Sequence, residues 1–233
     1  MIVVGCGPAG IFSALELVQA SRLSVLMLDK GRDINERRCP ASRGLGCVNC
    51  SPCSLLSGWG GAGAFSDGKL TLSPEVGGWL GEYVGTEKLV EEIAYVDQTY
   101  LRFGAPEELY GVETDSIEEI EHKASLAGLK LVPERLRHLG TEKCAQVLRE
   151  MKKFLQKSIE IRTDIEVKTL LIDERRVVGV ETVSGERISG RYVVVGPGRV
   201  GAEWLTSEAQ TLGLRTLNNP VDVGVRVEIP AAV

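Results

Sequence analysis

Nine residues near the start of the chain carry the clearest chemical signal in the sequence. Residues 2–10 read Ile-Val-Val-Gly-Cys-Gly-Pro-Ala-Gly, an apolar run that passes into a G-x-G-x-x-G pattern. Gly5 permits a tight turn after a strand, Gly7 lets the backbone approach a pyrophosphate, and Gly10 lets a helix lie close to the strand. The first N–H groups of that helix would face the phosphates. The pattern predicts a dinucleotide site formed by Gly5, Gly7, Pro8, Ala9 and Gly10.

An acidic residue follows near the spacing that a nucleotide ribose requires. Residues 24–29 read Ser-Val-Leu-Met-Leu-Asp, which predicts a second strand that ends in a carboxylate. A carboxylate about 20 residues beyond the glycine motif accepts hydrogen bonds from ribose hydroxyls in dinucleotide-binding folds. The alternative is a surface aspartate that closes a strand. We predict that Asp29 and its neighbour Lys30 belong to the site, and that the carboxylate disfavours the 2′-phosphate of NADP there.

Four of the six cysteines lie between positions 39 and 53. A C-x-x-C-x-x-C run can turn three thiolates toward one centre, and the cysteine before it can supply a fourth ligand. The spacing favours a [4Fe–4S] cluster or a tetrahedral Zn²⁺ site and does not separate the two. Structural disulfides are disfavoured for a cytoplasmic chain. The predicted metal ligands are Cys39, Cys47, Cys50 and Cys53.

Hydrophobic periodicity predicts the elements that position these residues. A strand at 2–4 leads into a helix over 9–20, and residues 77–158 are mainly helical. An apolar stripe runs from Leu89 to Phe103, and a Ser116-x-x-Glu119 pattern predicts a capping box for a second helix. Thr141 is the predicted cap of a third helix, whose apolar face we expect in the core.

The period then changes to that of strands. Residues 165–172, 177–183 and 187–195 predict three strands of an antiparallel meander, joined by turns at 173–176 and 184–186. The last of them runs into Gly196-Pro197-Gly198, a glycine-rich turn. A simple NAD-binding domain does not need such a meander.

Length and charge narrow the class of protein. A chain of 233 residues with 43% hydrophobic content can bury a hydrophobic core and is long enough for one large domain or for one and a half domains. A net charge of −5 argues against nucleic acid or an anionic membrane as the main partner. We find no apolar stretch long enough to span a bilayer and no signal peptide, so the sequence predicts a cytoplasmic protein.

The combined pattern resembles the FAD-dependent oxidoreductases of the glutathione-reductase-like superfamily, in which a βαβ unit, a helical insertion and a three-stranded meander build a Rossmann-like FAD-binding domain. Three segments are similar to the uncharacterised FAD-dependent dehydrogenases, whose relatives are described as NAD(P)/FAD-dependent oxidoreductases. These segments are Gly60–Leu70, Arg137–Thr141 and Pro197–Trp204. The resemblance covers essentially the whole chain.

The resemblance implies a domain organisation and a set of cofactor contacts. The FAD-binding domain would cover residues 1–215, with the helical insertion at about 75–158 and the meander at about 165–195. Residues 216–233, which include an expected strand over 221–229, would begin a truncated substrate domain, because members of the superfamily are longer. The glycine motif and Asp29 would hold the ADP half of FAD, and the backbone of Val167 would contact adenine. The turn after the last strand would contribute Gly196 and Gly198.

A second glycine-rich segment, residues 60–69, reads Gly-Gly-Ala-Gly-Ala-Phe-Ser-Asp-Gly-Lys. Closely spaced glycines expose successive backbone N–H groups, and the polar side chains add a hydroxyl, a carboxylate and a cation. The composition favours a loop over pyrophosphate or flavin, and the alternative is a flexible lid with a solvated lysine. The predicted cofactor contacts are Gly60, Gly61, Gly63, Ser66, Asp67, Gly68 and Lys69.

The sequence thus favours an enzyme that transfers hydride or electrons through non-covalently bound FAD. NAD(P)H is a candidate donor, and the partner is a small-molecule substrate or an electron carrier; no catalytic residue can be assigned. One alternative is a flavin-linked dithiol-disulfide oxidoreductase. In such enzymes four residues separate the two redox cysteines, whereas Cys47, Cys50 and Cys53 are separated by two or five residues. Another is a non-catalytic module that binds a nucleotide or a metal.

Overall fold

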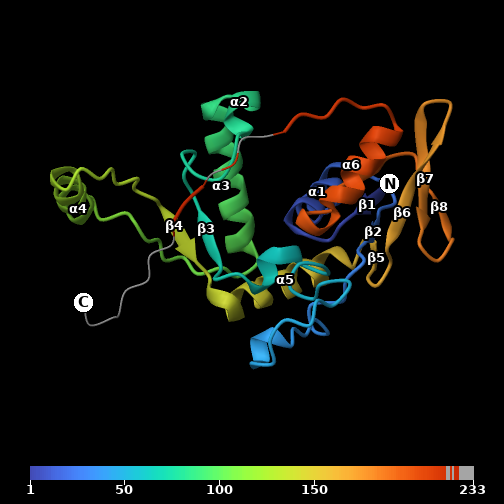
Figure 1. Cartoon of the computed structure of the whole chain (residues 1–233), viewed down its shortest axis with the longest axis horizontal. Coiled ribbons are helices and arrows are strands. Elements are labelled where there is room, and N and C mark those ends of the chain that lie inside the picture. The colour runs from blue at the N-terminus through green and yellow to red at the C-terminus, as the bar shows by residue number, and fades with distance from the viewer. Residues whose placement is uncertain (219–220, 222, 226–233) are drawn as a thin grey trace.

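The protein is described by a computed structural model that covers residues 1–218, 221 and 223–225. Its centre is a four-stranded parallel sheet in the order β5-β2-β1-β9 (Figure 1). The strands are β1 (Ile2–Val4), β2 (Leu26–Leu28), β5 (Glu160–Arg162) and β9 (Val193–Val195). The chain moves outward from β1 to β5 and then returns to place β9 on the other side of β1. This arrangement is the predicted Rossmann-like α/β fold.

Side chains alternate between the two faces of this sheet, as expected for strands. Val3 and Met27 share one buried cluster with α1 (Pro8–Ala20) and α5 (Gly140–Leu155). Ile2 and Leu28 belong to a second cluster that includes residues of the meander. The predicted strand at 2–4 and the helix over 9–20 are therefore confirmed, and the helix starts one residue earlier, with Pro8 in its first turn.

The meander is a separate antiparallel sheet in the order β6-β7-β8. Its strands are β6 (Val167–Asp173), β7 (Arg176–Thr182) and β8 (Arg187–Ser189). The prediction of one strand over 187–195 was wrong, because the chain leaves the meander after β8 and joins the parallel sheet as β9. At the crossing, a Cβ on Gly190 would lie 2.7 Å from the Ile2 side chain, so the two sheets pack closely there.

Residues 77–158 are mainly helical, as predicted. They contain α2 (Leu80–Val84), α3 (Thr86–Arg102), α4 (Thr114–Leu126) and α5, with α4 lying apart from the sheet (Figure 1). Two predicted caps were wrong: Ser116 lies inside α4, and Thr141 lies inside α5, where its hydroxyl donates to the Ser66 carbonyl at 3.2 Å. The helices begin after Glu113 and Leu139, without a capping side-chain hydrogen bond.

A small antiparallel sheet interrupts this helical region and was not predicted. It pairs β3 (Lys69–Thr71) with β4 (Leu136–His138). Arg137 of β4 is 3% exposed, and its guanidinium donates two hydrogen bonds to the Asp97 carboxylate of α3, at 2.7 and 2.8 Å. Arg137 is buried because it pairs with a residue that is distant in the sequence, and such a contact produces no hydrophobic periodicity along the chain. The sequence pattern therefore could not reveal this strand.

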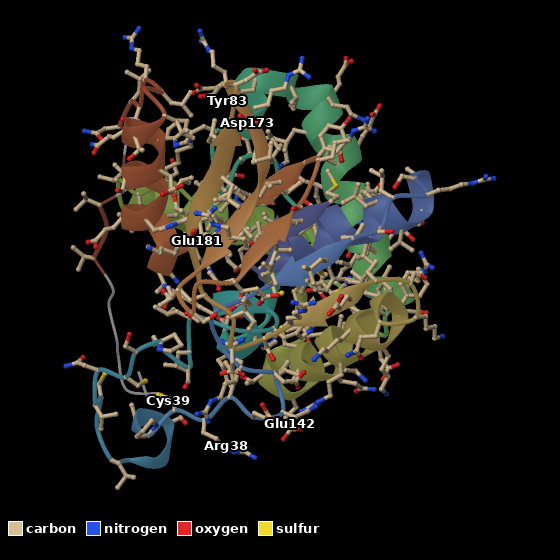
Figure 2. All side chains as sticks on the ribbon, turned by 90° about the vertical axis from the view of Figure 1, so that its right-hand side faces the viewer. Arg38, Cys39, Tyr83, Glu142, Asp173 and Glu181 are labelled. Atoms are coloured by element: carbon tan, nitrogen blue, oxygen red, sulfur yellow. The ribbon has the colours of Figure 1, made fainter. Side chains whose placement is uncertain are left out.

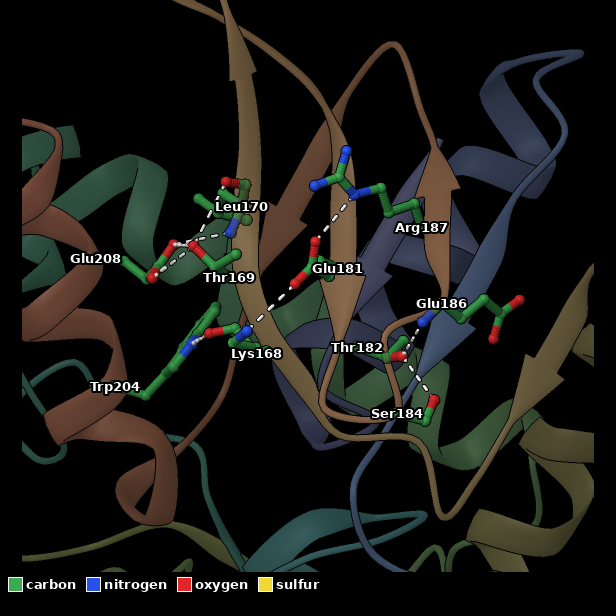
Figure 3. Close-up of polar contacts among 10 residues, drawn as sticks. All are labelled: Lys168, Thr169, Leu170, Glu181, Thr182, Ser184, Glu186, Arg187, Trp204 and Glu208. Carbon is green, nitrogen blue, oxygen red and sulfur yellow. Dashed lines mark hydrogen bonds and ion pairs between the residues drawn. The ribbon is translucent and has the colours of Figure 1, made fainter.

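Helix α6 (Ala202–Thr211) follows β9 through the short helical turn η3 (Arg199–Gly201) and packs on the edge of the meander (Figure 3). The Trp204 indole N–H donates to the Lys168 carbonyl at 2.8 Å. The buried Glu208 carboxylate accepts from the Thr169 hydroxyl at 3.0 Å and from the Leu170 N–H at 2.8 Å. These bonds hold α6 against β6.

The predicted second domain at 216–233 and its strand over 221–229 fall largely outside the described residues. The domain boundaries therefore stay predictions. In the described part of the chain, none of the helices has the length and apolar character that a bilayer crossing requires.

Candidate functional site

A cavity of about 480 Å³ lies beyond the carboxyl ends of β1, β2 and β9. In open parallel sheets, ligands bind at this edge, where the strand order reverses. Here the reversal falls at β1, between β2 and β9. The cavity is lined by the turns after β1 and β9, the end of β2, parts of residues 56–63 and 165–167, and the start of α6.

The glycines after β1 differ in what surrounds them. A Cβ on Gly5 would lie 2.1 Å from the Gly196 carbonyl oxygen, and a Cβ on Gly10 would lie 1.9 Å from that of Gly5. A Cβ on Gly7 would meet only the Gly61 Cα, at an ordinary 3.7 Å. Two glycines are therefore required by packing, whereas a side chain on Gly7, which lines the cavity, would occupy space that a ligand can use.

Helix α1 starts at this cavity. Pro8 and Ala9, at its first turn, line the cavity, and Gly7 is the residue that precedes the helix. N–H groups in a first helical turn have no acceptor inside the helix, and the helix dipole makes that end electropositive. The end of α1 can therefore receive an anionic group such as a phosphate.

Asp29 lines the cavity at the end of β2 and also holds three segments together. Its carboxylate accepts from the backbone N–H groups of Cys6, Gly31 and Gly58, at 2.7, 2.8 and 2.7 Å. A carboxylate offers about four lone-pair positions, so one position is left for a ligand hydroxyl. The sequence pattern predicted Asp29 as a ligand contact and did not predict its hydrogen bonds to the backbone of three segments.

The segment over residues 60–69 is divided between two cavities. Gly61 and Gly63 line the main cavity, and a Cβ on Gly61 would lie 2.9 Å from the Gly7 Cα. A smaller cavity of about 120 Å³ lies next to it and shares Pro8 and Gly63 with it. The predicted residues that line this second cavity are Gly60, Gly63, Ser66, Gly68 and Lys69.

Asp67 lines neither cavity in the described part of the chain. It pairs with Lys69 at 3.1 Å on the surface, and the hydrogen bond from Lys69 lowers the pKa of its carboxyl. Besides Lys69, two buried titratable groups line the smaller cavity, and both are held neutral, because burial raises the pKa of Tyr100 to about 12 and raises that of the Cys144 thiol. Neither group is poised to exchange a proton near pH 7.

The other predicted nucleotide contacts reach the main cavity. They are Lys30, Val167, Gly196 and Gly198. The cavity is also lined by residues that we did not predict as site residues: Leu56, Ser57, Ile165, Glu166, Arg199 and Trp204. Arg199 had a usable signal, because it follows the glycine turn after β9 directly, whereas Leu56 and Ser57 belong to no motif that we can identify.

Arg37 positions the segment that brings Ser57 to the cavity. Its side chain is 2% exposed and donates to the carbonyls of Ser54, Leu55 and Trp59 at 2.9, 2.8 and 2.7 Å. Its guanidinium lies 4.7 Å from the centre of the Phe65 ring. Burial lowers the pKa of Arg37 to about 10, so the side chain stays charged near pH 7. Sequence reasoning missed it, because a lone arginine carries no spacing signal.

The predicted metal ligands are not brought together. Cys47 is exposed, the thiols of Cys39, Cys50 and Cys53 are half-buried, and all four are free. Within the described residues, no group of three or more His, Cys, Asp or Glu side chains is placed to hold a metal ion. Cys39 lies on a segment that projects from the body of the molecule (Figure 2). The arrangement therefore gives no support to a metal centre formed by the four cysteines.

Comparison with protein-family models gives no match for this chain. A 72-residue stretch, 30% of the chain, is 42% identical to an uncharacterised protein of Clostridium beijerinckii and covers 13% of it. The fold is similar to glycine oxidase from Geobacillus kaustophilus, with a TM-score of 0.51 and 14% identity over 92% of this chain and 58% of that one.

Glycerol-3-phosphate dehydrogenase from Bacillus halodurans, solved in complex with FAD, has a TM-score of 0.45 and 15% identity over 91% of this chain and 36% of that one. The chain therefore spans less than two thirds of the length of each of these proteins. The similarity to glycine oxidase shows the fold.

Proposed function

We propose that the protein is the FAD-binding part of a flavin-dependent oxidoreductase and that the ADP half of FAD lies in the main cavity. The observation that carries the proposal is the cavity itself, which lies where the strand order reverses and is lined by Gly7, the start of α1 and Asp29. The residues fit a dinucleotide, since a side chain on Gly7 would project where the pyrophosphate is expected.

Each part of the nucleotide then has a defined neighbour. The pyrophosphate would lie against Gly7 and the first turn of α1, and Arg199 at the turn after β9 adds a cation near this end. The remaining acceptor position of Asp29 would take a ribose hydroxyl, and the backbone of Val167 would contact adenine. When bound, the flavin would supply the hydride- or electron-accepting ring.

The sequence resemblance to the FAD-dependent dehydrogenases supports the oxidoreductase part of the proposal. Several glycines in the segments that carry this resemblance line the two cavities, namely Gly60, Gly61, Gly63 and Gly198. NAD(P)H stays the candidate donor, with a small-molecule substrate or an electron carrier as partner. The six free thiols fit the cytoplasmic location that we infer from the sequence, because thiols stay reduced there.

We do not extend the proposal to a [4Fe–4S] cluster or a Zn²⁺ site, because Cys39, Cys47, Cys50 and Cys53 do not converge on one centre. The dithiol-disulfide oxidoreductase gains no support either, since none of the four lines the main or the smaller cavity among the described residues. A non-catalytic module would bind a nucleotide without flavin, and this distinguishes it from our proposal.

The test is the absorption spectrum of the purified 233-residue chain before and after addition of FAD, followed by titration with FAD and with FMN. We expect one FAD per chain and much weaker binding of FMN, because FMN lacks the adenosine half that the cavity would hold. Nucleotide binding without flavin uptake would favour the non-catalytic module. Failure to bind FAD at all would contradict the proposal.

A further inference from the structure

Ser57 has a side chain that the fold alone does not explain. Among the described residues, its hydroxyl is the single buried side-chain nitrogen or oxygen without a hydrogen-bond partner. The residue is 5% exposed. Buried polar groups in folded proteins are almost always paired, so an unpaired hydroxyl indicates a partner beyond the chain's own groups.

The location of Ser57 indicates which partner this is. Ser57 lines the main cavity, and the next residue, Gly58, donates its N–H to the Asp29 carboxylate at 2.7 Å. A Cβ on Gly31 would lie 2.3 Å from the Ser57 carbonyl carbon, so the segment rests on the chain just after Asp29. Ser57 and Asp29 therefore meet at the same end of the cavity.

The other polar groups at this end already have partners. The Asp29 carboxylate accepts three backbone hydrogen bonds, and the Lys30 ammonium lies 3.6 Å from the Glu166 carboxylate. Arg37 holds the residues on both sides of Ser57 through the carbonyls of Leu55 and Trp59. The Ser57 hydroxyl is thus an uncommitted group on a fixed piece of backbone.

We propose that Ser57 and Asp29 together bind the ribose diol of the adenine nucleotide. Asp29 accepts from one hydroxyl with its remaining lone pair, and the Ser57 hydroxyl turns about its Cα–Cβ bond to exchange a hydrogen bond with the other. The inference rests on the proposed function, which places the adenosine half of FAD at this end. It makes Ser57 a specificity residue that recognises one of the two ribose hydroxyls.

The test measures binding of ADP, 2′-deoxy-ADP and 3′-deoxy-ADP to the 233-residue chain by calorimetry. Loss of one neutral hydrogen bond corresponds to about a 5-fold change in affinity. Ser57→Ala is expected to weaken ADP about 5-fold and to leave the affinity for one of the two deoxy analogues unchanged. The preference for ADP over that analogue then disappears. A purely structural role for Ser57 would weaken all three ligands alike.

Two further variants make the result unambiguous. Ser57→Cys keeps the side-chain volume with a weak donor, and it is also expected to lose the preference. Ser54→Ala is the matched control, because Ser54 is three residues away and does not line the cavity in the described part of the chain. It is expected to behave like the wild-type chain toward all three nucleotides.

A preference for ADP over both deoxy analogues that persists in Ser57→Ala and Ser57→Cys would overturn the inference and leave the proposed function standing, provided that the wild-type chain binds FAD. If the wild-type chain binds neither FAD nor ADP, the proposed function fails and the inference fails with it. Equal binding of ADP and both deoxy analogues by the wild-type chain would also overturn the inference.

Discussion

The glycine turn after β1 and the cysteine segment over residues 39–53 differ in what surrounds them. In the turn, Gly5 donates to the Leu28 carbonyl and the Cys6 carbonyl accepts from Gly60, both at 2.8 Å, so distant segments meet at the backbone. In the cysteine segment, Leu45 is 74% exposed and Val48 is 59% exposed. The glycine motif would bind a ligand through its backbone, and close packing of distant segments is enough to hold that backbone in place. The cysteine motif would bind a metal through its side chains, which requires a fold that brings the thiols to one centre.

The largest effect should come from Gly10→Ala. Alanine normally favours a helix over glycine by about 1 kcal/mol, but here the new methyl group would lie 1.9 Å from the Gly5 carbonyl oxygen. We expect the overlap to dominate and to lower the free energy of unfolding by about 3 kcal/mol, measured by chemical denaturation. A variant as stable as the wild-type chain would show that the turn is not as tightly packed as described.

Arg37→Lys should have the next largest effect, because Arg37 links the segment after the cysteines to the cavity. Lysine keeps the charge but cannot reach the carbonyls of Ser54, Leu55 and Trp59 together. We expect a loss of about 2 kcal/mol in the free energy of unfolding and weaker FAD binding. Unchanged FAD affinity would contradict the positioning role. Arg38→Lys, at an exposed neighbour, is the matched control.

Gly7→Ala should separate binding from folding. Its Cβ would meet no atom closer than the Gly61 Cα at 3.7 Å, so the stability should stay within about 1 kcal/mol of wild type. The same methyl group would project into the cavity, and we expect FAD affinity to fall at least about 10-fold, a loss of about 1.4 kcal/mol. Calorimetric titration measures the affinity. Tight FAD binding by this variant would place the pyrophosphate elsewhere.

Cys47→Ser should have the smallest effect. Cys47 is exposed and does not line either cavity in the described part of the chain. We expect changes below about 0.5 kcal/mol in stability, no change in FAD affinity and no effect of a chelator on the melting temperature. A lower melting temperature with both the chelator and the substitution would show that a metal gathers the cysteines.

Local patterns predicted the parts of the site that depend on local chain geometry. The strand at 2–4, the helix that follows it and the location of Asp29 all come from contiguous segments with a clear period and spacing. The parts that sequence reasoning missed depend on contacts between distant residues. Arg37 bonds to carbonyls 17 to 22 residues away, and the Ser57 hydroxyl is defined by the absence of a partner among the described residues.

The split of the predicted strand over 187–195 has the same origin. Residues 187–189 alternate between polar and apolar, residues 193–195 are all valine, and both patterns are compatible with a strand. The period of the side chains does not say which sheet each half joins. The chain passes close to the Ile2 side chain at Gly190 and then pairs with β1 as β9, a contact between distant residues that the local pattern does not contain. The four cysteines are a different case. Their spacing is typical of a metal site, but in the described part of the chain the fold does not bring three or more of them to one centre.

We propose that the ADP half of FAD lies on the glycine turn after β1. A crystal structure of the 233-residue chain grown with FAD would show where the nucleotide binds. We expect the pyrophosphate within hydrogen-bond distance of the backbone at Gly7 and the first turn of α1, with the adenosine ribose at Asp29. A pyrophosphate bound away from this turn, or crystals without nucleotide at saturating FAD, would contradict it.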